Sequence, residues 1–256
     1  MLDNLVDFDP EKLTKPEDMP VLDRWLLTKL NELIEKAEQS YCDYEFHIIT
    51  HAVNDFCVNT LSSFYLDIVK DRLYCADEHA RRCAQTALYR ILVDFTKLVA
   101  PILCFTAQEI WSYIPKLEGM QEYVCWERMP EAKSDEDAAF DAKWAKIIAV
   151  RDDVKKVLEQ ARADKIIGSS LEAAVTLHCS DEMYDFLNAI PMDELADLMI
   201  VSHVDLVKGE GGVKGLTEGL GMSVAHAAGN KCLRCWKFDT AVGEDGLCPR
   251  CAKVLG

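Results

Sequence analysis

The sequence predicts a mainly α-helical chain built in three consecutive parts. Residues 1–135 are expected to form an antiparallel helix bundle, residues 136–228 a long helix with a small α/β module, and residues 229–256 a cysteine-rich ribbon. Three observations support this. Apolar residues recur every three to four positions through the first 114 residues, apolar and polar residues alternate in short runs after Gly168, and two Cys-x-x-Cys pairs stand near the end.

Four amphipathic stripes define the bundle. They run from Leu22 to Ala37, from Phe46 to Ile68, from Ala84 to Leu98 and from Thr106 to Ile114. Pro101 ends the third helix, because proline has no N–H to continue the hydrogen-bond ladder. Thr106 and Glu109 have the spacing of a capping box, which predicts the start of the fourth helix. Since the connections are short, neighbouring helices are expected to be antiparallel.

The second part begins after an irregular connector, residues 115–136, which contains prolines, glycine and an acidic run. A fifth helix is expected from about Asp137 to Asp164. The remaining elements are predicted as strands over 171–179, 198–207 and 222–228, a short helix over 180–190, and a glycine-rich loop or hairpin over 208–221. Together they predict a small α/β module that leads into the ribbon.

The ribbon contains the strongest chemical signal in the sequence. Cys232 and Cys235 form one Cys-x-x-Cys pair, and Cys248 and Cys251 form a second after twelve intervening residues. Two such pairs supply the four soft thiolate ligands of a closed, tetrahedral, structural zinc site. Two adjacent disulfides, a redox pair or an iron site are the alternatives. The other seven cysteines are scattered, which argues against a disulfide framework, and each is expected to be a small buried hydrophobic side chain.

Composition limits the classes of function. The formal net charge of −16 argues against extensive nucleic-acid contact, since phosphates require Lys and Arg. The segment from Lys231 to Gly256, however, has five basic and three acidic side chains, and permits a modest RNA contact. No apolar run is long enough to span a membrane, and the first residues lack the pattern of a signal peptide. A cytoplasmic protein without membrane contact is therefore expected.

Other motifs are weak. His47 and His51 lie one helical turn apart but lack the Glu of the metalloprotease pattern, and residues 209–212 are glycine-rich without the strand and helix that a dinucleotide loop needs. No phosphate-binding loop or nucleophile elbow is present, and no convincing catalytic group stands out. Arg234 and Trp236, which flank Cys235, suit base stacking and phosphate contact, although a tryptophan that packs on the ribbon is an alternative.

Several segments together resemble the C-terminal half of isoleucyl-tRNA synthetase. They are LDRWLLTKLNELI (22–34), NDFCVNTLSSFYLDIVKDRLY (54–74), LVAPILCFTAQEIW (98–111) and KKVLEQARADKIIGSSLEAAVTL (155–177). The ending KCLRCWKFD…LCPRC is similar to the C-terminal zinc finger of the bacterial form, whereas valyl enzymes usually end in a helical arm. The resemblance is collinear and covers nearly the whole chain.

The resemblance implies a helical anticodon-binding domain of a class I synthetase, a small junction module and a zinc ribbon that reaches the anticodon loop of isoleucine tRNA. It implies that Arg234 and Trp236 contact anticodon nucleotides, with Lys237 and Arg250 close by as further tRNA-binding candidates. In the bundle, Arg24, Lys70 and Arg72 are basic candidates, with solvated or ion-paired surface positions as the plainer interpretation. A monomer that does not bind DNA is expected.

The chain departs from the resembled family in one respect. The H-I-G-H and K-M-S-K-S signatures of the nucleotide-binding domain are absent. We therefore expect the C-terminal part of an ATP-dependent isoleucine–tRNA ligase, with zinc as its own cofactor, ATP used only by the missing catalytic domain, and no activity alone. A zinc-stapled protein-interaction domain without RNA binding is the alternative, since the acidic charge also suits a protein partner.

Overall fold

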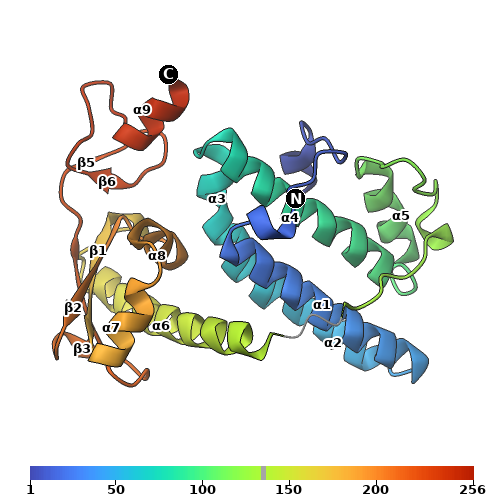
Figure 1. Ribbon diagram of the computed structural model, residues 1–256, viewed down its shortest axis with the longest axis horizontal. Coiled ribbons are helices and arrows are strands. Elements are labelled where there is room, and N and C mark those ends of the chain that lie inside the picture. Colours follow the sequence, from blue (N-terminus) through green and yellow to red (C-terminus); the bar gives the residue numbers. More distant parts are fainter. Residues whose placement is uncertain (134–136) are drawn as a thin grey trace. The chain divides into compact units, whose positions relative to one another are not determined.

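The computed structural model describes residues 1–133 and 137–256, which fall into two compact units, Met1–Asp135 and Glu136–Gly256. The first is helical and the second combines helices with a small sheet (Figure 1). The mainly α-helical fold predicted from the sequence is confirmed. The three-part division with its boundary between residues 228 and 229 stays a prediction. Among the described residues, no helix is long and apolar enough to cross a membrane.

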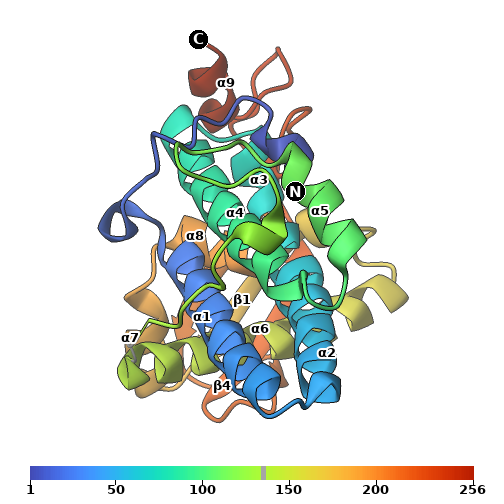
Figure 2. The same cartoon turned by 90° about the vertical axis from the view of Figure 1, so that its right-hand side faces the viewer.

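The first unit is an up-and-down bundle. Its helical segments are α1 (Val21–Cys42), α2 (Phe46–Asp55), a π-helical segment (Phe56–Tyr65), α3 (Leu66–Tyr74), α4 (Glu78–Val99) and α5 (Cys104–Tyr113). Figure 2 shows α1 and α2 side by side, joined by a short turn. Short 3-10 turns at Leu2–Leu5, Pro16–Asp18 and Val124–Trp126 lie outside these helices. The predicted stripes supply the core, including the fully buried Leu26, Leu88 and Trp111.

The second predicted stripe is helical throughout but not uniformly α-helical. Phe56 and Leu61 are five residues apart, one or two more than an α-helical face requires, and both side chains are buried. A π-helix, in which the N–H bonds to the carbonyl five residues earlier, brings residues at this spacing onto one face. The wider spacing therefore explains why π geometry replaces α geometry between α2 and α3.

The predicted capping box at Thr106 is wrong. The helix α5 begins at Cys104, with Leu103 as its N-cap, so Thr106 lies inside the first turn and makes no cap. The backbone N–H groups of Ile102 and Leu103 both bond to the carbonyl of Val99, at 3.0 and 2.8 Å. This turn carries the chain around Pro101 and starts the new helix three residues earlier than the capping pattern indicates.

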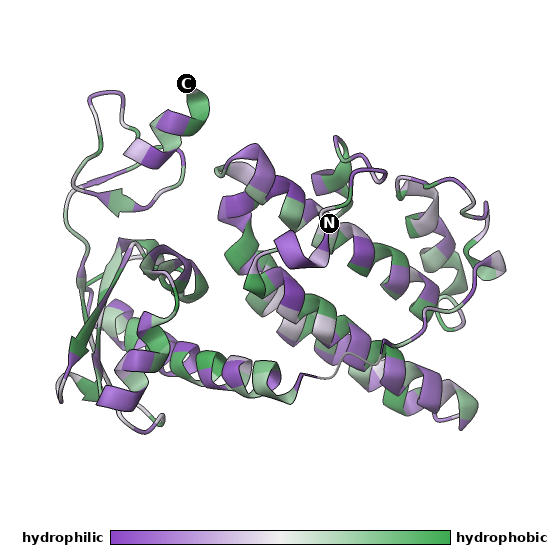
Figure 3. Ribbon diagram, in the orientation of Figure 1, coloured by the Kyte–Doolittle hydropathy of each residue, from purple (hydrophilic) through white to green (hydrophobic). Residues whose placement is uncertain are grey.

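The second unit contains α6 (Ala138–Ala163), β1 (Ala173–Cys179), α7 (Asp181–Asn188), α8 (Met192–Met199), β2 (His203–Lys208), β3 (Val213–Lys214) and β4 (Leu220–His226). The strand order is β2-β1-β4-β3, with β1 parallel to β2 and antiparallel to β4. Alternate side chains of β1 are buried, as the period of two predicts. Figure 3 shows the mixed hydropathy along the helices that pack on this sheet.

The strand predicted over 198–207 is partly wrong. Residues 192–199 form α8, which the sequence analysis missed, and β2 starts only at His203. Pro191 precedes this helix, and Asp193 and Glu194 stand in its first turn, which are ordinary start signals. The helix ends at Ile200, whose φ of 56° places a β-branched residue in a conformation usually taken by glycine or asparagine.

Two features fix the glycine-rich stretch that the sequence analysis interpreted as a flexible loop or hairpin. Residues 213–214 form β3, which pairs with β4, so the stretch is a hairpin. Buried Asp153 on α6 accepts a hydrogen bond from the backbone N–H of Thr217 at 2.7 Å and pairs with Lys156 at 3.1 Å. The loop is thereby tied to the long helix.

Candidate metal centre

The ribbon is held by a short antiparallel pair, β5 (Asn230–Lys231) and β6 (Phe238–Asp239), and ends in α9 (Pro249–Leu255), a helix that the sequence analysis did not predict. The turn between the strands is closed by two backbone hydrogen bonds. The N–H of Cys232 donates to the carbonyl of Lys237 at 2.9 Å, and the N–H of Trp236 donates to the carbonyl of Cys232 at 3.0 Å. This tight turn brings Cys232 and Cys235 together.

The second cysteine pair lies at the start of α9. Cys248 is the N-cap residue and Pro249, with its fixed φ, occupies the first helical turn. Cys251 then faces back one turn later and is fully buried. The N–H of Leu233 donates to the carbonyl of Gly246 at 2.9 Å, which ties the segment before α9 to the first cysteine turn.

The four predicted ligands converge. The Sγ atoms of Cys232, Cys235, Cys248 and Cys251 all lie within 4.8 Å of one another, and all four residues are buried. The Sγ atoms of Cys235 and Cys248 are 3.7 Å apart. A tetrahedral zinc with Zn–S bonds of about 2.3 Å requires sulfurs about 3.8 Å apart, which the Cys235–Cys248 separation matches.

The surroundings of the sulfurs shift the thiol pKa values in different directions. Burial raises the pKa of the Cys232 thiol, but backbone N–H groups of Cys235, Cys248 and Arg234 outweigh it and bring this pKa to about 6. For Cys235, burial and the neighbouring sulfurs raise the pKa to about 12. Metal ligation requires deprotonated sulfurs, and a divalent zinc ion supplies the positive charge that offsets neighbouring buried thiolates.

The exposed part of the ribbon is its first cysteine turn. Trp236 is 60% exposed, and its φ of 66° lies in the left-handed region. The Nζ of Lys231 lies 5.6 Å from the centre of the Trp236 ring. Arg234 is half-buried and Arg250 is exposed at the start of α9. Lys231, which the sequence analysis passed over, thus adds a cation beside the indole.

Lys237 is placed differently from the other predicted tRNA contacts. Its ammonium pairs with Asp197 on α8, and both side chains are largely buried. Next to it, the N–H of Phe238 donates to the hydroxyl of Ser202 at 2.7 Å, and the Phe238 ring packs edge-on against His226. Lys237 therefore helps to hold the ribbon on the α/β module.

The three basic candidates in the first unit lie in different environments. Arg72 is mostly buried and forms a two-point ion pair with Asp23. Lys70 is exposed and pairs with Asp67 at 2.8 Å, and Arg24 is exposed. For Arg72 the plainer interpretation, an ion-paired structural residue, matches the observed contacts.

Comparison with known proteins identifies the family. Residues 23–177 match the family described as the anticodon-binding domain of tRNA ligase. The chain belongs to this family. Residues 229–254 match a second family, a zinc finger found in FPG and IleRS. Together with the converging cysteines, this match identifies one structural zinc site in the ribbon of this anticodon-binding family member.

The chain is similar to the C-terminal part of several isoleucine–tRNA ligases. It is 44% identical over 269 residues to the ligase of Desulfitobacterium hafniense, covering all of this chain and 29% of that protein. It is 44% identical over 265 residues to the ligase of Geobacter sulfurreducens, covering 28% of it, and 42% identical to that of Actinobacillus pleuropneumoniae. The chain thus spans less than a third of the length of these curated relatives.

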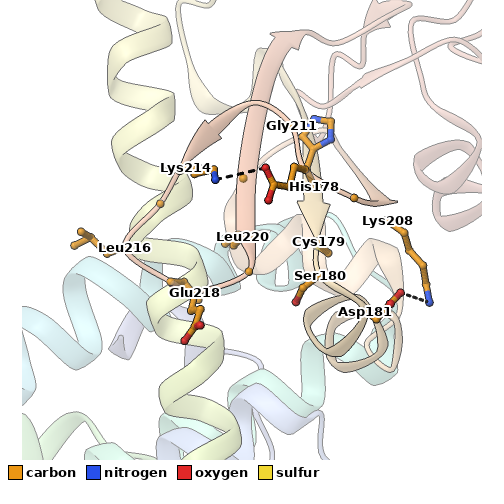
Figure 4. A pocket seen from close by; sticks show the side chains of 16 residues that line it. His178, Cys179, Ser180, Asp181, Lys208, Gly211, Lys214, Leu216, Glu218 and Leu220 are labelled. Atoms are coloured by element: carbon orange, nitrogen blue, oxygen red, sulfur yellow. Dashed lines mark ion pairs between the residues drawn. The ribbon is translucent and has the colours of Figure 1, made fainter.

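The glycine-rich hairpin also borders a hollow of about 680 Å³ (Figure 4). Two ion pairs lie among its charged side chains: Lys208 pairs with Asp181 at 3.2 Å, and Lys214 pairs with Glu210 at 3.6 Å. His178 lies 3.1 Å from the hydroxyl of Ser223, and a Cβ at Gly211 would overlap its ring. These contacts close the hairpin over β1.

Proposed function

We propose that the chain is the tRNA-binding, C-terminal part of an isoleucine–tRNA ligase and recognises the anticodon loop of isoleucine tRNA. The anticodon-binding family match and the relatives' shared name support this proposal. The activation of isoleucine with ATP and its transfer to tRNA belong, in this proposal, to the part of the relatives that lies outside the matched region. A monomer in the cytoplasm that does not bind DNA is part of the same proposal.

One observation carries the proposal: the exposure and backbone strain of Trp236. A tryptophan that served only to pack on the ribbon would be buried, yet 60% of this side chain is exposed. Its left-handed backbone also costs about 1–2 kcal/mol for a residue with a Cβ. An exposed indole held at a tight turn by a zinc site is suited to stack on an unpaired loop base.

The charges near Trp236 support RNA contact despite the acidic chain. Lys231 lies beside the indole, and Arg234 and Arg250 lie on the cysteine turn and on α9. We propose that Trp236 stacks on an anticodon base while Arg234 and Arg250 approach phosphates or base edges. We leave Lys237 out of the contact set, because its ammonium is paired with Asp197 inside the module.

Binding of isoleucine tRNA by the zinc-loaded chain tests the proposal. We expect Trp236→Ala to weaken binding by about 1–3 kcal/mol, which is the range for loss of one base stack. Trp126→Ala is a matched control, because Trp126 is 62% exposed but lies in the first unit. We also expect affinity to fall as salt rises.

The specificity of the contact is tested with a tRNA that differs only in its anticodon. We expect weaker binding to the altered tRNA, and Trp236→Ala should reduce the difference between the two. Equal affinity for both tRNAs would exclude anticodon recognition. Binding of a protein partner that survives nuclease treatment, with no tRNA binding, would support the alternative of a protein-interaction domain.

A further inference from the structure

One end of the helical bundle exposes a group of large apolar side chains that the proposed RNA contact does not use. Tyr44, Phe46, Ile102, Leu103 and Phe105, here called the end patch, are 80%, 49%, 39%, 49% and 89% exposed. Pro101 and Cys104 beside them are exposed as well. Monomeric proteins rarely leave so many apolar groups together in water, and such a patch usually marks an interface.

The two turns that form the end patch are connected. The hydroxyl of Tyr41, near the end of α1, donates to the carbonyl of Leu98, near the end of α4, at 2.8 Å. The Tyr41 ring also contacts the ring of Phe46, with centres 6.1 Å apart, and Phe46 in turn lies 6.3 Å from Tyr44. The α1–α2 turn and the α4–α5 turn therefore lie at the same end of the bundle (Figures 1 and 2).

The charges around the end patch argue against RNA as its partner. Neither residues 38–46 nor residues 101–110 contain a Lys or Arg. The same two segments contain four exposed carboxylates instead, those of Glu38, Asp43, Glu45 and Glu109. Phosphates would be repelled by these carboxylates, whereas a protein surface with an apolar centre and basic margin would be attracted.

The length of the relatives points to the protein surface that binds the end patch. This chain corresponds to 29% of the Desulfitobacterium hafniense ligase, so most of each relative lies outside the matched region. We propose that the end patch is the docking surface for that remaining part of a ligase of this family, which presents an apolar centre with basic margins. The inference rests on the proposed function, because it assumes that the chain works beside such a catalytic part.

Accessibility measurements test the docking directly. In one protein, here called the joined protein, this chain replaces the matched region of the Desulfitobacterium hafniense ligase. The rates of hydroxyl-radical oxidation of Tyr44, Phe46 and Phe105 are then compared between the joined protein and the free chain. We expect oxidation of the patch to be at least fivefold slower in the joined protein, while Trp236, on the ribbon, is oxidised equally in both. Equal oxidation of the patch in the two proteins would overturn the proposal.

Two further measurements test for other partners of the end patch. Protection in the free chain that appears on adding isoleucine tRNA would show an RNA surface, and protection that increases with the concentration of the free chain would show a second copy. Either result overturns the proposal. Because oxidation does not depend on tRNA binding, this arm stands even if the proposed anticodon recognition fails.

A pair of substitutions gives the functional consequence. We expect Leu103→Ser with Phe105→Ser to lower aminoacylation kcat/KM of the joined protein about tenfold, the effect of losing a hot-spot contact. The same pair in the free chain should change tRNA affinity by less than twofold. Val58→Ser, another exposed apolar position in the bundle, is the control and should leave both unchanged. Unchanged aminoacylation in an active joined protein carrying the pair would contradict docking.

Discussion

Asp23 and Arg72 form a two-point ion pair inside the helical bundle, with Nη1 donating to Oδ1 at 3.0 Å and Nη2 donating to Oδ2 at 2.5 Å. The hydroxyl of Tyr65 donates to the same carboxylate at 2.8 Å. Asp23 is fully buried, and burial with the adjacent carboxylate raises the pKa of Tyr65 well above its usual value. This network joins α1 to the π-helical segment and to α3 through the interior of the bundle.

We expect Asp23→Asn to lower the free energy of unfolding by about 3–5 kcal/mol, because it leaves the Arg72 charge buried without a counter-ion. Urea unfolding followed by helical circular dichroism measures this. Asp67→Asn is the control: its pair with Lys70 is exposed, and its loss should cost less than about 1 kcal/mol. A joint change, Asp23→Leu with Arg72→Met, should cost less than Asp23→Asn, since both charges leave together. Equal costs for the two aspartate variants would contradict the argument.

The contribution of Asp153 to the stability of the fold depends on pH, and the direction of the dependence follows from its pKa. Burial raises the pKa of this carboxyl, but hydrogen bonds from Thr217 and Leu216 and the pair with Lys156 outweigh it and lower the pKa from 3.8 to about 2. A carboxyl whose pKa is lower in the folded state stabilises the fold above its unfolded pKa, and this contribution is lost as pH falls from about 4 through about 2. The shift corresponds to roughly 2 kcal/mol.

We therefore expect Asp153→Asn to destabilise the second unit by roughly 2 kcal/mol at pH 7, and the difference from the unsubstituted chain to shrink as pH falls below 4. Denaturant titrations at a series of pH values measure it. Asp152→Asn, an exposed neighbour on the same helix, should show neither effect. A difference that stays constant down to pH 2 would rule out the ionised carboxylate as its source.

The zinc site predicts a defined stoichiometry and a local unfolding. We expect one zinc per chain, and Cys251→Ser to lose it, while Cys125→Ser, an exposed cysteine outside the ribbon, retains it. Chelation should remove the hydrogen-exchange protection of the amides of Cys232 and Leu233 and leave that of α4 intact, because metal binding supplies the folding free energy of the short ribbon. Retained zinc in Cys251→Ser would contradict the four-ligand site.

The sequence could predict what depends on periodicity and on spacing. The stripes gave the helices of the bundle, alternation gave β1, and the doubled Cys-x-x-Cys gave the converging sulfurs. It failed where one local pattern suited two structures. Residues 198–201 form an unbroken apolar run that suits a buried helix end as well as a strand, so the end of α8 and the start of β2 could not be separated. Thr106 likewise had a capping pattern inside a helix. The pairing of Lys237 with Asp197 depends on tertiary contacts forty residues apart, which no local pattern carries.

Trp236 should show a conflict between ribbon stability and RNA binding. Its φ of 66° is favourable for glycine and strained for tryptophan. Trp236→Gly relieves that strain, worth about 1–2 kcal/mol, although the added freedom of glycine in the unfolded chain offsets part of it. We expect this variant to retain zinc at least as well as the unsubstituted chain against a competing chelator.

The same variant should bind isoleucine tRNA about tenfold more weakly or worse, because the stacking surface is gone. Trp236→Phe keeps an aromatic ring and the strained backbone. It should therefore retain more tRNA affinity than Trp236→Gly, and it should retain no more zinc than Trp236→Gly does. If Trp236→Gly instead released zinc faster, the indole would be a packing element of the ribbon. If it bound tRNA normally, the exposed ring would not be a contact, and the strain at this turn would have no role in recognition.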